Sequence, residues 1–212
     1  MDLIVSQQRN EVIWALQRCG TNHLRAIAAS GISDWRLLFS YKNADKLASM
    51  KVTRIVRDPL QRWLSWFTSF IIQGNEDGSA NPLHDYYSNI DVKNWEVGDA
   101  RLFFTEFEKI MYEDGHTIPQ HIGYFEYENL NHNNHFVLME NIDIYLQISR
   151  KQHQPEFKEV FYNLESNVQQ YIMNTVCSLY EKDYLWINEL DLNPVLPTQK
   201  TSSTANLFLT TL

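Results

Sequence analysis

Lys51 to Phe67 reads KVTRIVRDPLQRWLSWF and carries, in order, the signals of a strand, a turn and a helix. The first six residues are rich in β-branched side chains, which favour a buried strand. Asp58 is a good helix N-cap, and Pro59 suits the first helical position because its fixed φ matches the helix. The next apolar residues recur at helical spacing to about Gln73: Leu60, Trp63, Leu64, Phe67, Phe70 and Ile71. The stretch therefore predicts a β–α unit.

An earlier stretch predicts a second unit of the same kind. Glu11 to Gln17 (EVIWALQ) is a short apolar strand that ends at a tight turn. His23 to Ser30 (HLRAIAAS) follows as an alanine-rich helix, and Gly31 is typical of the residue that ends a helix. Two consecutive strand–helix units indicate an α/β fold with a central, mainly parallel sheet flanked by helices.

The rest of the chain continues this alternation around one loop-rich region. Residues 74–98 contain GNEDGSANP and HDYYSN, which favour a loop that could hold an acceptor substrate. We expect one domain over residues 1–190 and a C-terminal tail over residues 191–212, which has two prolines and a Thr/Ser-rich spacer. The other predicted elements are strands at 35–41 and 134–140, a short helix at 43–50, and helices at 103–111, 142–149 and 155–186.

Composition is that of a globular protein. The 212 residues are 44% apolar and 21% charged. Two cysteines, Cys19 and Cys177, cannot make a disulfide framework and suit a reducing compartment. The first residues do not read as a signal peptide, and no apolar run approaches the length of a membrane span. We therefore expect a cytoplasmic protein without a transmembrane segment.

Charge is divided unevenly along the chain. The net charge of −8 argues against general nucleic-acid binding. Residues 1–62, however, hold ten of the 18 Lys/Arg and only five of the 26 Asp/Glu, which gives this part +5 and leaves −13 for the rest. A compact basic region in an acidic protein suits a small anion; the alternative is that these charges are ordinary solvated helix faces.

The first turn, Arg18 to Asn22, has the composition of a phosphate cradle. Between a strand and a helix, unpaired backbone N–H groups and the helix dipole attract an anion. Gly20 would let the backbone approach the anion closely, Thr21 and Asn22 could add hydrogen bonds, and Arg18 adds a fixed charge. The turn is not a Walker A motif, because no Lys precedes Thr21. The alternative is an ordinary turn whose threonine caps its helix.

The second turn offers a guanidinium and a hydroxyl. Arg57 ends the predicted strand, and Ser65 lies eight residues on, just over two helical turns. Together they could bind one phosphate monoester. The alternative is that Arg57 pairs with Asp58 or a carbonyl, and that Ser65 is a buried polar residue without a ligand.

Together the two turns resemble the sulfotransferases that use 3′-phosphoadenosine 5′-phosphosulfate (PAPS). Residues 57–67 (RDPLQRWLSWF) match every fixed position of the family's second motif, RDPxxRxxSxF/Y, and residues 17–24 (QRCGTNHL) are similar to its first motif. Later segments resemble the carbohydrate-type branch and keep its order: FFTEF at 103–107, HTIPQ at 116–120, FVLMENI at 136–142 and YEKDYLW at 180–186. The resemblance covers roughly residues 11–188 and implies a P-loop-like three-layer fold.

The resemblance also implies the roles of individual residues. The 5′-phosphosulfate would contact six residues: Arg18, Cys19, Gly20, Thr21, Asn22 and His23. Arg57 and Ser65 would bind the 3′-phosphate, and Arg62 would have a structural role. The family's usual Pro-Lys is Gln17-Arg18 here, and arginine does not give up its proton, so Arg18 could only stabilise leaving-group charge. No metal is required.

The implied reaction moves a sulfuryl group from PAPS to a hydroxyl of a carbohydrate, a glycolipid or a small polar acceptor, and it needs a base. His116, which precedes Pro119-Gln120, is the leading candidate for the base, and a structural role is its alternative. His84, His23 and a carboxylate of the loop at 74–98 stay open. Two other functions are weighed: a catalytically inactive nucleotide-binding or interaction module of the same fold, and a different P-loop phosphotransferase.

Overall fold

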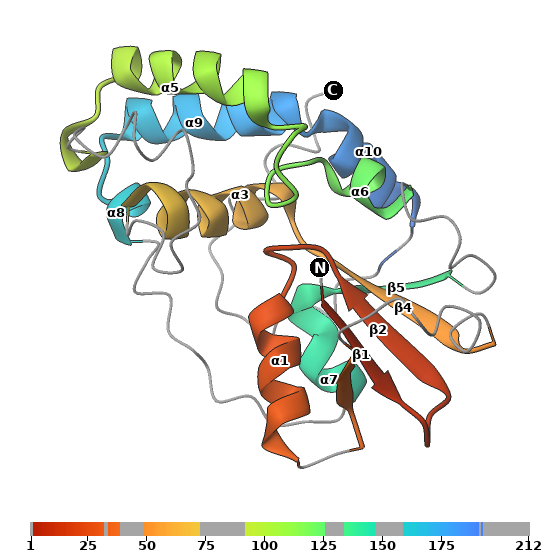
Figure 1. The fold of residues 1–212 in the computed structure, drawn as a ribbon. Helices are drawn as coiled ribbons and strands as arrows, with labels where there is room; N and C mark the ends of the chain where they lie inside the picture. The colour runs from red at the N-terminus through yellow and green to blue at the C-terminus, as the bar shows by residue number, and fades with distance from the viewer. Residues whose placement is uncertain are drawn as a thin grey trace.

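The computed structural model describes residues 2–31, 34–38, 49–72, 92–125, 134–146 and 159–190, together with Leu192. It contains a five-stranded sheet in the order β3-β1-β2-β4-β5, shown in Figure 1. The strands are β1 (Asp2–Ser6), β2 (Glu11–Ala15), β3 (Arg36–Leu38), β4 (Lys51–Val56) and β5 (Asn134–Leu138). The α/β class and the strands predicted from Glu11 and from Lys51 are confirmed.

The sheet is mixed rather than mainly parallel. β2, β4 and β5 are parallel neighbours, but β1 runs antiparallel to both β2 and β3. The sequence did not predict β1. Strand β1 pairs with β2 in antiparallel orientation, because only Gln7 to Asn10 separate the two strands and such a short connection can join only antiparallel strands. Asn10 closes this hairpin with a φ of 48°.

Helices occupy most of the remaining described chain. The two helices that follow the predicted strands are α1 (Thr21–Ser30) and α3 (Pro59–Phe67), and α3 continues as a π-helical segment, η2 (Thr68–Ile72). As expected, the Asp58 carboxylate caps α3 by accepting from Gln61 N at 2.8 Å. The later elements are η3 (Val92–Asn94), α5 (Val97–Ile110), α6 (Gln120–Phe125), η5 (Met139–Asn141), α7 (Ile142–Leu146), α8 (Glu159–Tyr162), α9 (Ser166–Leu179) and α10 (Glu181–Glu189).

Several predicted elements fall partly or wholly outside the described residues. They are the end of the strand at 35–41, nearly all of the helix at 43–50, most of the loop at 74–98, and the tail at 191–212 apart from Leu192. Leu192 packs against the sheet core. The helical region predicted from residue 155 is described from Glu159 onward and divides into α8, α9 and α10.

Both faces of the sheet are covered by helices. On one face, Tyr145 of α7 donates a hydrogen bond to the buried carboxylate of Glu11 in β2. On the other face, Arg54 in β4 lies between Trp14 and Phe136, with its guanidinium carbon 5.0 and 5.8 Å from the two ring centres. Two further aromatic residues pack against these three side chains on the same face: Tyr124 of α6 and Trp186 of α10. Successive side chains of a strand therefore pack against helices on opposite faces of the sheet.

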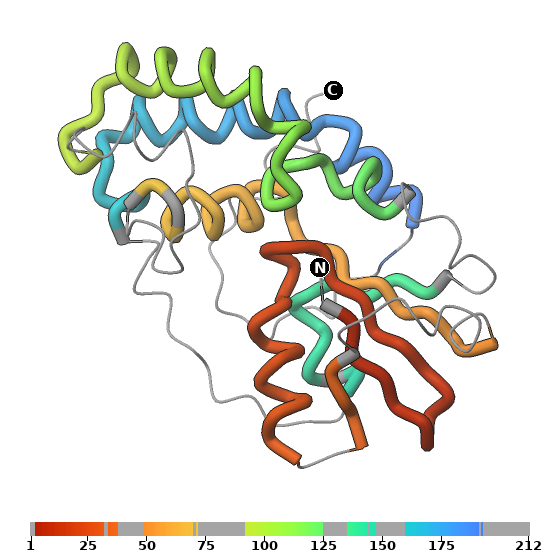
Figure 2. Tube along the Cα trace, viewed as in Figure 1, coloured from red at the N-terminus to blue at the C-terminus, as the bar shows by residue number. Residues whose placement is uncertain are grey.

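A second core lies beyond the carboxyl ends of the strands, among α3, α5, α8 and α9. Trp63 is central to it, stacking on Phe67 at 4.9 Å and on Phe104 at 5.4 Å. Trp66 contacts Phe107 at 5.0 Å. Figure 2 shows the chain passing directly from β4 into α3, so the second turn joins the sheet to this helical core.

Tyr124 ties the ends of β2 and β4 together and gives a stability test. Its hydroxyl accepts from Leu16 N at 3.2 Å and donates to Ile55 O. Burial raises the pKa of Tyr124 well above its ordinary value, so the hydroxyl keeps its proton. Tyr124→Phe should lower the free energy of unfolding by about 1–3 kcal/mol, because both backbone groups lose a buried partner. Urea unfolding of both proteins measures this.

Tyr112→Phe is the matched control, because Tyr112 is 57% exposed. The control variant should unfold within about 0.5 kcal/mol of the native protein. Equal stability of the native protein and Tyr124→Phe would contradict the bridging role.

Candidate functional site

Both predicted turns lie at the carboxyl edge of the sheet, side by side. The first follows β2 and the second follows β4, which are neighbouring parallel strands. After β2 the chain proceeds through α1 to β3 on one side, whereas after β4 it eventually reaches β5 on the other side (Figure 1). Open α/β sheets bind ligands at such a point, where the strand order reverses.

The two turns are joined directly. The Arg57 guanidinium donates to Arg18 O through Nη1 at 2.9 Å. Gln120 Oε1 accepts from Arg57 N at 2.9 Å and from the Cys19 thiol at 3.1 Å, and Gln120 Nε2 donates to Arg57 O at 2.6 Å. The Gln120 side chain is fully buried. Residues predicted from two separate motifs therefore form one continuous structure.

Arg62 attaches a third segment to the first turn. Its buried guanidinium donates to three carbonyls: Gln17 O at 3.2 Å, Ile118 O at 2.6 Å and Gly115 O at 3.3 Å. This geometry agrees with the structural role expected for Arg62. It also brings the HTIPQ segment, which contains His116, against the first turn.

The backbone of the first turn is unusual. Arg18 has a φ of 64° and Gly20 a φ of 98°, both in the left-handed region. A Cβ atom at Gly20 would collide with Met139 Sδ of η5. Glycine is therefore required here by backbone conformation and by packing, whereas its predicted close approach to an anion stays a prediction.

Helix α1 begins after a glycine. The N-cap residue is Gly20, which has no side chain to make a capping hydrogen bond. The alternative in which Thr21 caps the helix is therefore wrong, because Thr21 is already the first helical residue. No acidic residue lies in the first turn of α1. Thr21 and Asn22 thus lie at the N-terminal end of a ten-residue helix, and such an end can attract an anion.

Cys19 contributes through its backbone only. Its side chain is fully buried and donates to Gln120. Burial raises the pKa of the Cys19 thiol, although Arg62 and Arg57 partly oppose this. The thiol is therefore held protonated and inward, and any contact of Cys19 with a ligand must use its main chain, whose N–H donates to Leu16 O at 2.9 Å.

His23 is already engaged. Its Nε2 lies 2.7 Å from an Asp143 carboxylate oxygen, at the start of α7. The pair joins α1 to α7 on one face of the sheet. This ring nitrogen is occupied by a carboxylate, so any contact of His23 with an anion must use another part of the residue.

His116 pairs with the residue two positions before it. Its Nδ1 and its backbone N lie 2.7 and 2.8 Å from the same Asp114 carboxylate oxygen. Burial acts to raise the pKa of Asp114, but the hydrogen bonds from His116 hold it below its ordinary value. In the tautomer that donates to Asp114 from Nδ1, Nε2 is an acceptor, which is the arrangement that a general base needs.

Ser65 is placed by its helical neighbours. Arg62 precedes it by three residues within α3 and donates to Gln17 O at 3.2 Å. Residues at this spacing share one face of an α-helix. The half-buried Ser65 therefore lies on the face of α3 that is directed at the first turn.

Sequence reasoning missed Asp183, which holds Gln120 by a hydrogen bond to its backbone. This fully buried carboxylate accepts from Gln120 N at 2.8 Å and from His121 N at 2.9 Å. It also pairs with His121 Nδ1 at 2.6 Å. Gln120 and Asp183 both lie in segments that resemble the sulfotransferase branch, but nothing local indicates which residues they contact. Their separation of 63 positions explains the omission.

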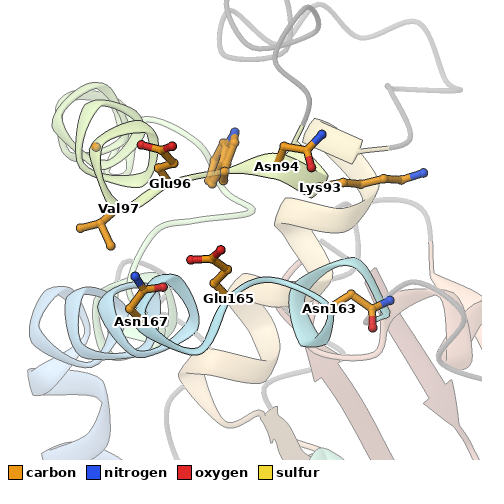
Figure 3. A pocket seen from close by; sticks show the side chains of 9 residues that line it. Lys93, Asn94, Glu96, Val97, Asn163, Glu165 and Asn167 are labelled. Atoms are coloured by element: carbon orange, nitrogen blue, oxygen red, sulfur yellow. The ribbon is translucent and has the colours of Figure 1, made fainter.

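Other candidates lie elsewhere. His84 and His132 fall outside the described residues. His135 lies near the start of β5, at the opposite edge of the sheet, beside Tyr145. A cavity of about 410 Å³ opens where α5 and α9 begin, and Figure 3 shows Glu96 and Glu165 beside it. Glu96, a carboxylate of the loop at 74–98, lines this cavity, whereas no residue of the two turns does.

Comparison of the chain with protein-family models, with curated proteins and with solved structures finds no match. Within the described ranges, no helix is long and apolar enough to cross a membrane. The same residues contain no group of three or more His, Cys, Asp or Glu side chains that could hold a metal ion.

The burial of Cys19 predicts its reactivity. In a Cys177→Ser variant, Cys19 is the only thiol. Because burial raises its pKa and excludes reagents, iodoacetamide at pH 8 should modify it only as fast as the protein opens. Mass spectrometry over time, with and without urea, measures the rate. Rapid modification of the folded variant would show that the thiol faces solvent.

Proposed function

We propose that this chain is a sulfotransferase that uses PAPS and acts on a hydroxyl of a carbohydrate, a glycolipid or a small polar molecule. One observation carries the proposal: the Arg57 guanidinium contacts Arg18 O at 2.9 Å, so two anion-binding turns form one site where the strand order reverses. A nucleotide with phosphate groups at both its 5′ and 3′ positions needs two such sites close together.

The 5′ end of the cofactor would bind at the start of α1. Backbone N–H groups of Gly20 and Thr21, with the side chains of Thr21 and Asn22, would face the phosphosulfate. Cys19 stays in this group in the proposal, although its own N–H donates to Leu16 O at 2.9 Å. Arg18 would add the positive charge. His23 belongs to this group in the proposal, although its Nε2 is bonded to Asp143.

The 3′-phosphate would bind between Arg57 and Ser65. Arg57 Nη1 donates to Arg18 O, which places the planar guanidinium of Arg57 beside the first turn, where it would also donate to a phosphate oxygen. Ser65 lies on the same side, on the face of α3 directed at the first turn. The pair would distinguish a 3′-phosphorylated nucleotide from one that lacks this group.

When bound, PAPS would supply the sulfuryl group and leave as 3′-phosphoadenosine 5′-phosphate. His116 Nε2 would take the proton of the acceptor hydroxyl, with Asp114 holding the ring through Nδ1. Arg18 would stabilise the negative charge that grows on the departing oxygen. His84, His23 and a carboxylate of the loop at 74–98 are the other candidates for the base.

The proposal includes a P-loop-like three-layer arrangement, in which helices cover both faces of the sheet. It also includes a cytoplasmic setting, which is supported by the two free thiols, Cys19 and Cys177. The acidic net charge of −8 supports a small-molecule acceptor over a nucleic acid.

Nucleotide preference is the decisive test. The protein should bind 3′-phosphoadenosine 5′-phosphate at least roughly a hundredfold more tightly than AMP, because a charge-assisted bond contributes about 1.5–3 kcal/mol. Arg57→Ala should remove most of this preference, and Arg57→Lys should restore only part, because an ammonium lacks the planar fork. Calorimetric titration of both nucleotides into each protein measures the preference.

Arg101→Ala is the control, since Arg101 is exposed on α5. It should keep the preference of the native protein. Equal affinity of the native protein for the two nucleotides would exclude the sulfotransferase proposal as a whole. Binding without transfer of radiolabelled sulfate to any hydroxyl acceptor would instead favour a nucleotide-binding module without turnover.

The base is tested separately. His116→Ala should lower turnover by roughly 10²–10⁴ with little change in nucleotide affinity, because proton removal affects the chemical step. His135→Ala, at the opposite edge of the sheet, should keep full turnover. Steady-state rates and calorimetry on the same preparations make the comparison. Equal losses of turnover and of affinity in His116→Ala would give His116 a structural role.

A further inference from the structure

We infer that Ser69 is a positioning residue that holds the Arg18 guanidinium in place for the 5′ end of the cofactor. The inference rests on the proposed function and adds a residue that neither motif contains. Three observations converge on it: the backbone of Arg18, the shape of the segment that carries Ser69, and the hydrogen bond between them.

Arg18 is fixed at its backbone. Its φ of 64° is rare for a residue with a side chain, and such conformations persist only where neighbouring contacts impose them. The Arg57 guanidinium supplies one such contact by binding Arg18 O at 2.9 Å. Cys19 N, the next residue, donates to Leu16 O at 2.9 Å. The direction in which the Arg18 side chain leaves the turn is therefore set.

Ser69 lies where α3 changes its geometry. Helix α3 is regular to Phe67, and Thr68–Ile72 is π-helical. Single π-helical turns inside helices are rare and are frequent at functional sites. A wider turn changes the direction of every side chain in it, and here Ser69 Oγ lies 3.0 Å from Arg18 Nη1. The irregular segment is thus the part of the helix that reaches the first turn.

Arg18 is therefore held both at its backbone carbonyl and at its guanidinium. Arginine has many rotamers, and a site that binds an anion with an unrestrained arginine must lose that freedom on binding. With Oγ of Ser69 as an acceptor, the guanidinium is ordered in advance at the first turn. Ser65 lies four residues earlier, in the regular part of α3, so α3 and its π-helical continuation would together serve both phosphate positions.

The test is a double-mutant cycle between Ser69 and Arg18. Ser69→Ala should weaken binding of 3′-phosphoadenosine 5′-phosphate by up to about tenfold, because the Arg18 side chain must then be ordered on binding. In an Arg18→Met background the same substitution should change the affinity less than twofold. Ser69→Thr, which keeps the hydroxyl, should restore most of the affinity. Calorimetric titration gives all four affinities, and thermal unfolding verifies that each variant is folded.

Ser178→Ala, at an exposed position of α9, is the matched control and should bind as the native protein does. An equal loss from Ser69→Ala with and without Arg18 would overturn the positioning role and leave the proposed function intact. If the native protein does not prefer the 3′-phosphorylated nucleotide, the proposed function fails, and the same cycle is measured with inorganic pyrophosphate. Coupling of Ser69 to Arg18 there would support the inference alone, and no coupling or no binding would overturn it.

Discussion

Gln120 has a single carboxamide, and both turns at the carboxyl edge of the sheet bind to it. Its oxygen accepts from Cys19 in the first turn and from Arg57 N in the second, while its nitrogen donates to Arg57 O. Inside a protein an unpaired amide group is costly, so three buried groups depend on this one side chain. Asp183 then fixes Gln120 by accepting from its backbone N. The relative position of the two turns follows from this network.

The same network connects the two cores of the molecule. Asp183 belongs to α10, which packs through Trp186 against the sheet, and Arg57 leads into α3, which packs in the helical core. Arg62 adds a second connection by binding carbonyls on both sides of the site. A change in either core would therefore reach the site through this hydrogen-bond network.

Helices and strands are predicted well from the sequence where the residues that determine them are close together in the chain. The strand at Lys51–Val56 and the helix after Asp58-Pro59 carry their signals within a few residues, and both are confirmed. The N-terminal strand was missed because QQRN is a turn without glycine or proline, and a helix at Gln120 was missed because Asp183 satisfies its first N–H groups from 63 residues away. The predicted site residues could be listed, but the residues that assemble them could not.

The antiparallel β1–β2 hairpin has a consequence for how the chain folds during synthesis. All its pairings lie within residues 2–15, so it can form as soon as that segment is free, and local contacts of this kind form fast. Cys19, Arg57, Gln120 and Asp183 span most of the described chain, and their network closes only when α10 has been made. We expect the sheet to start early and the site to be completed last, so an incompletely made chain would have the beginnings of a fold without a functional site.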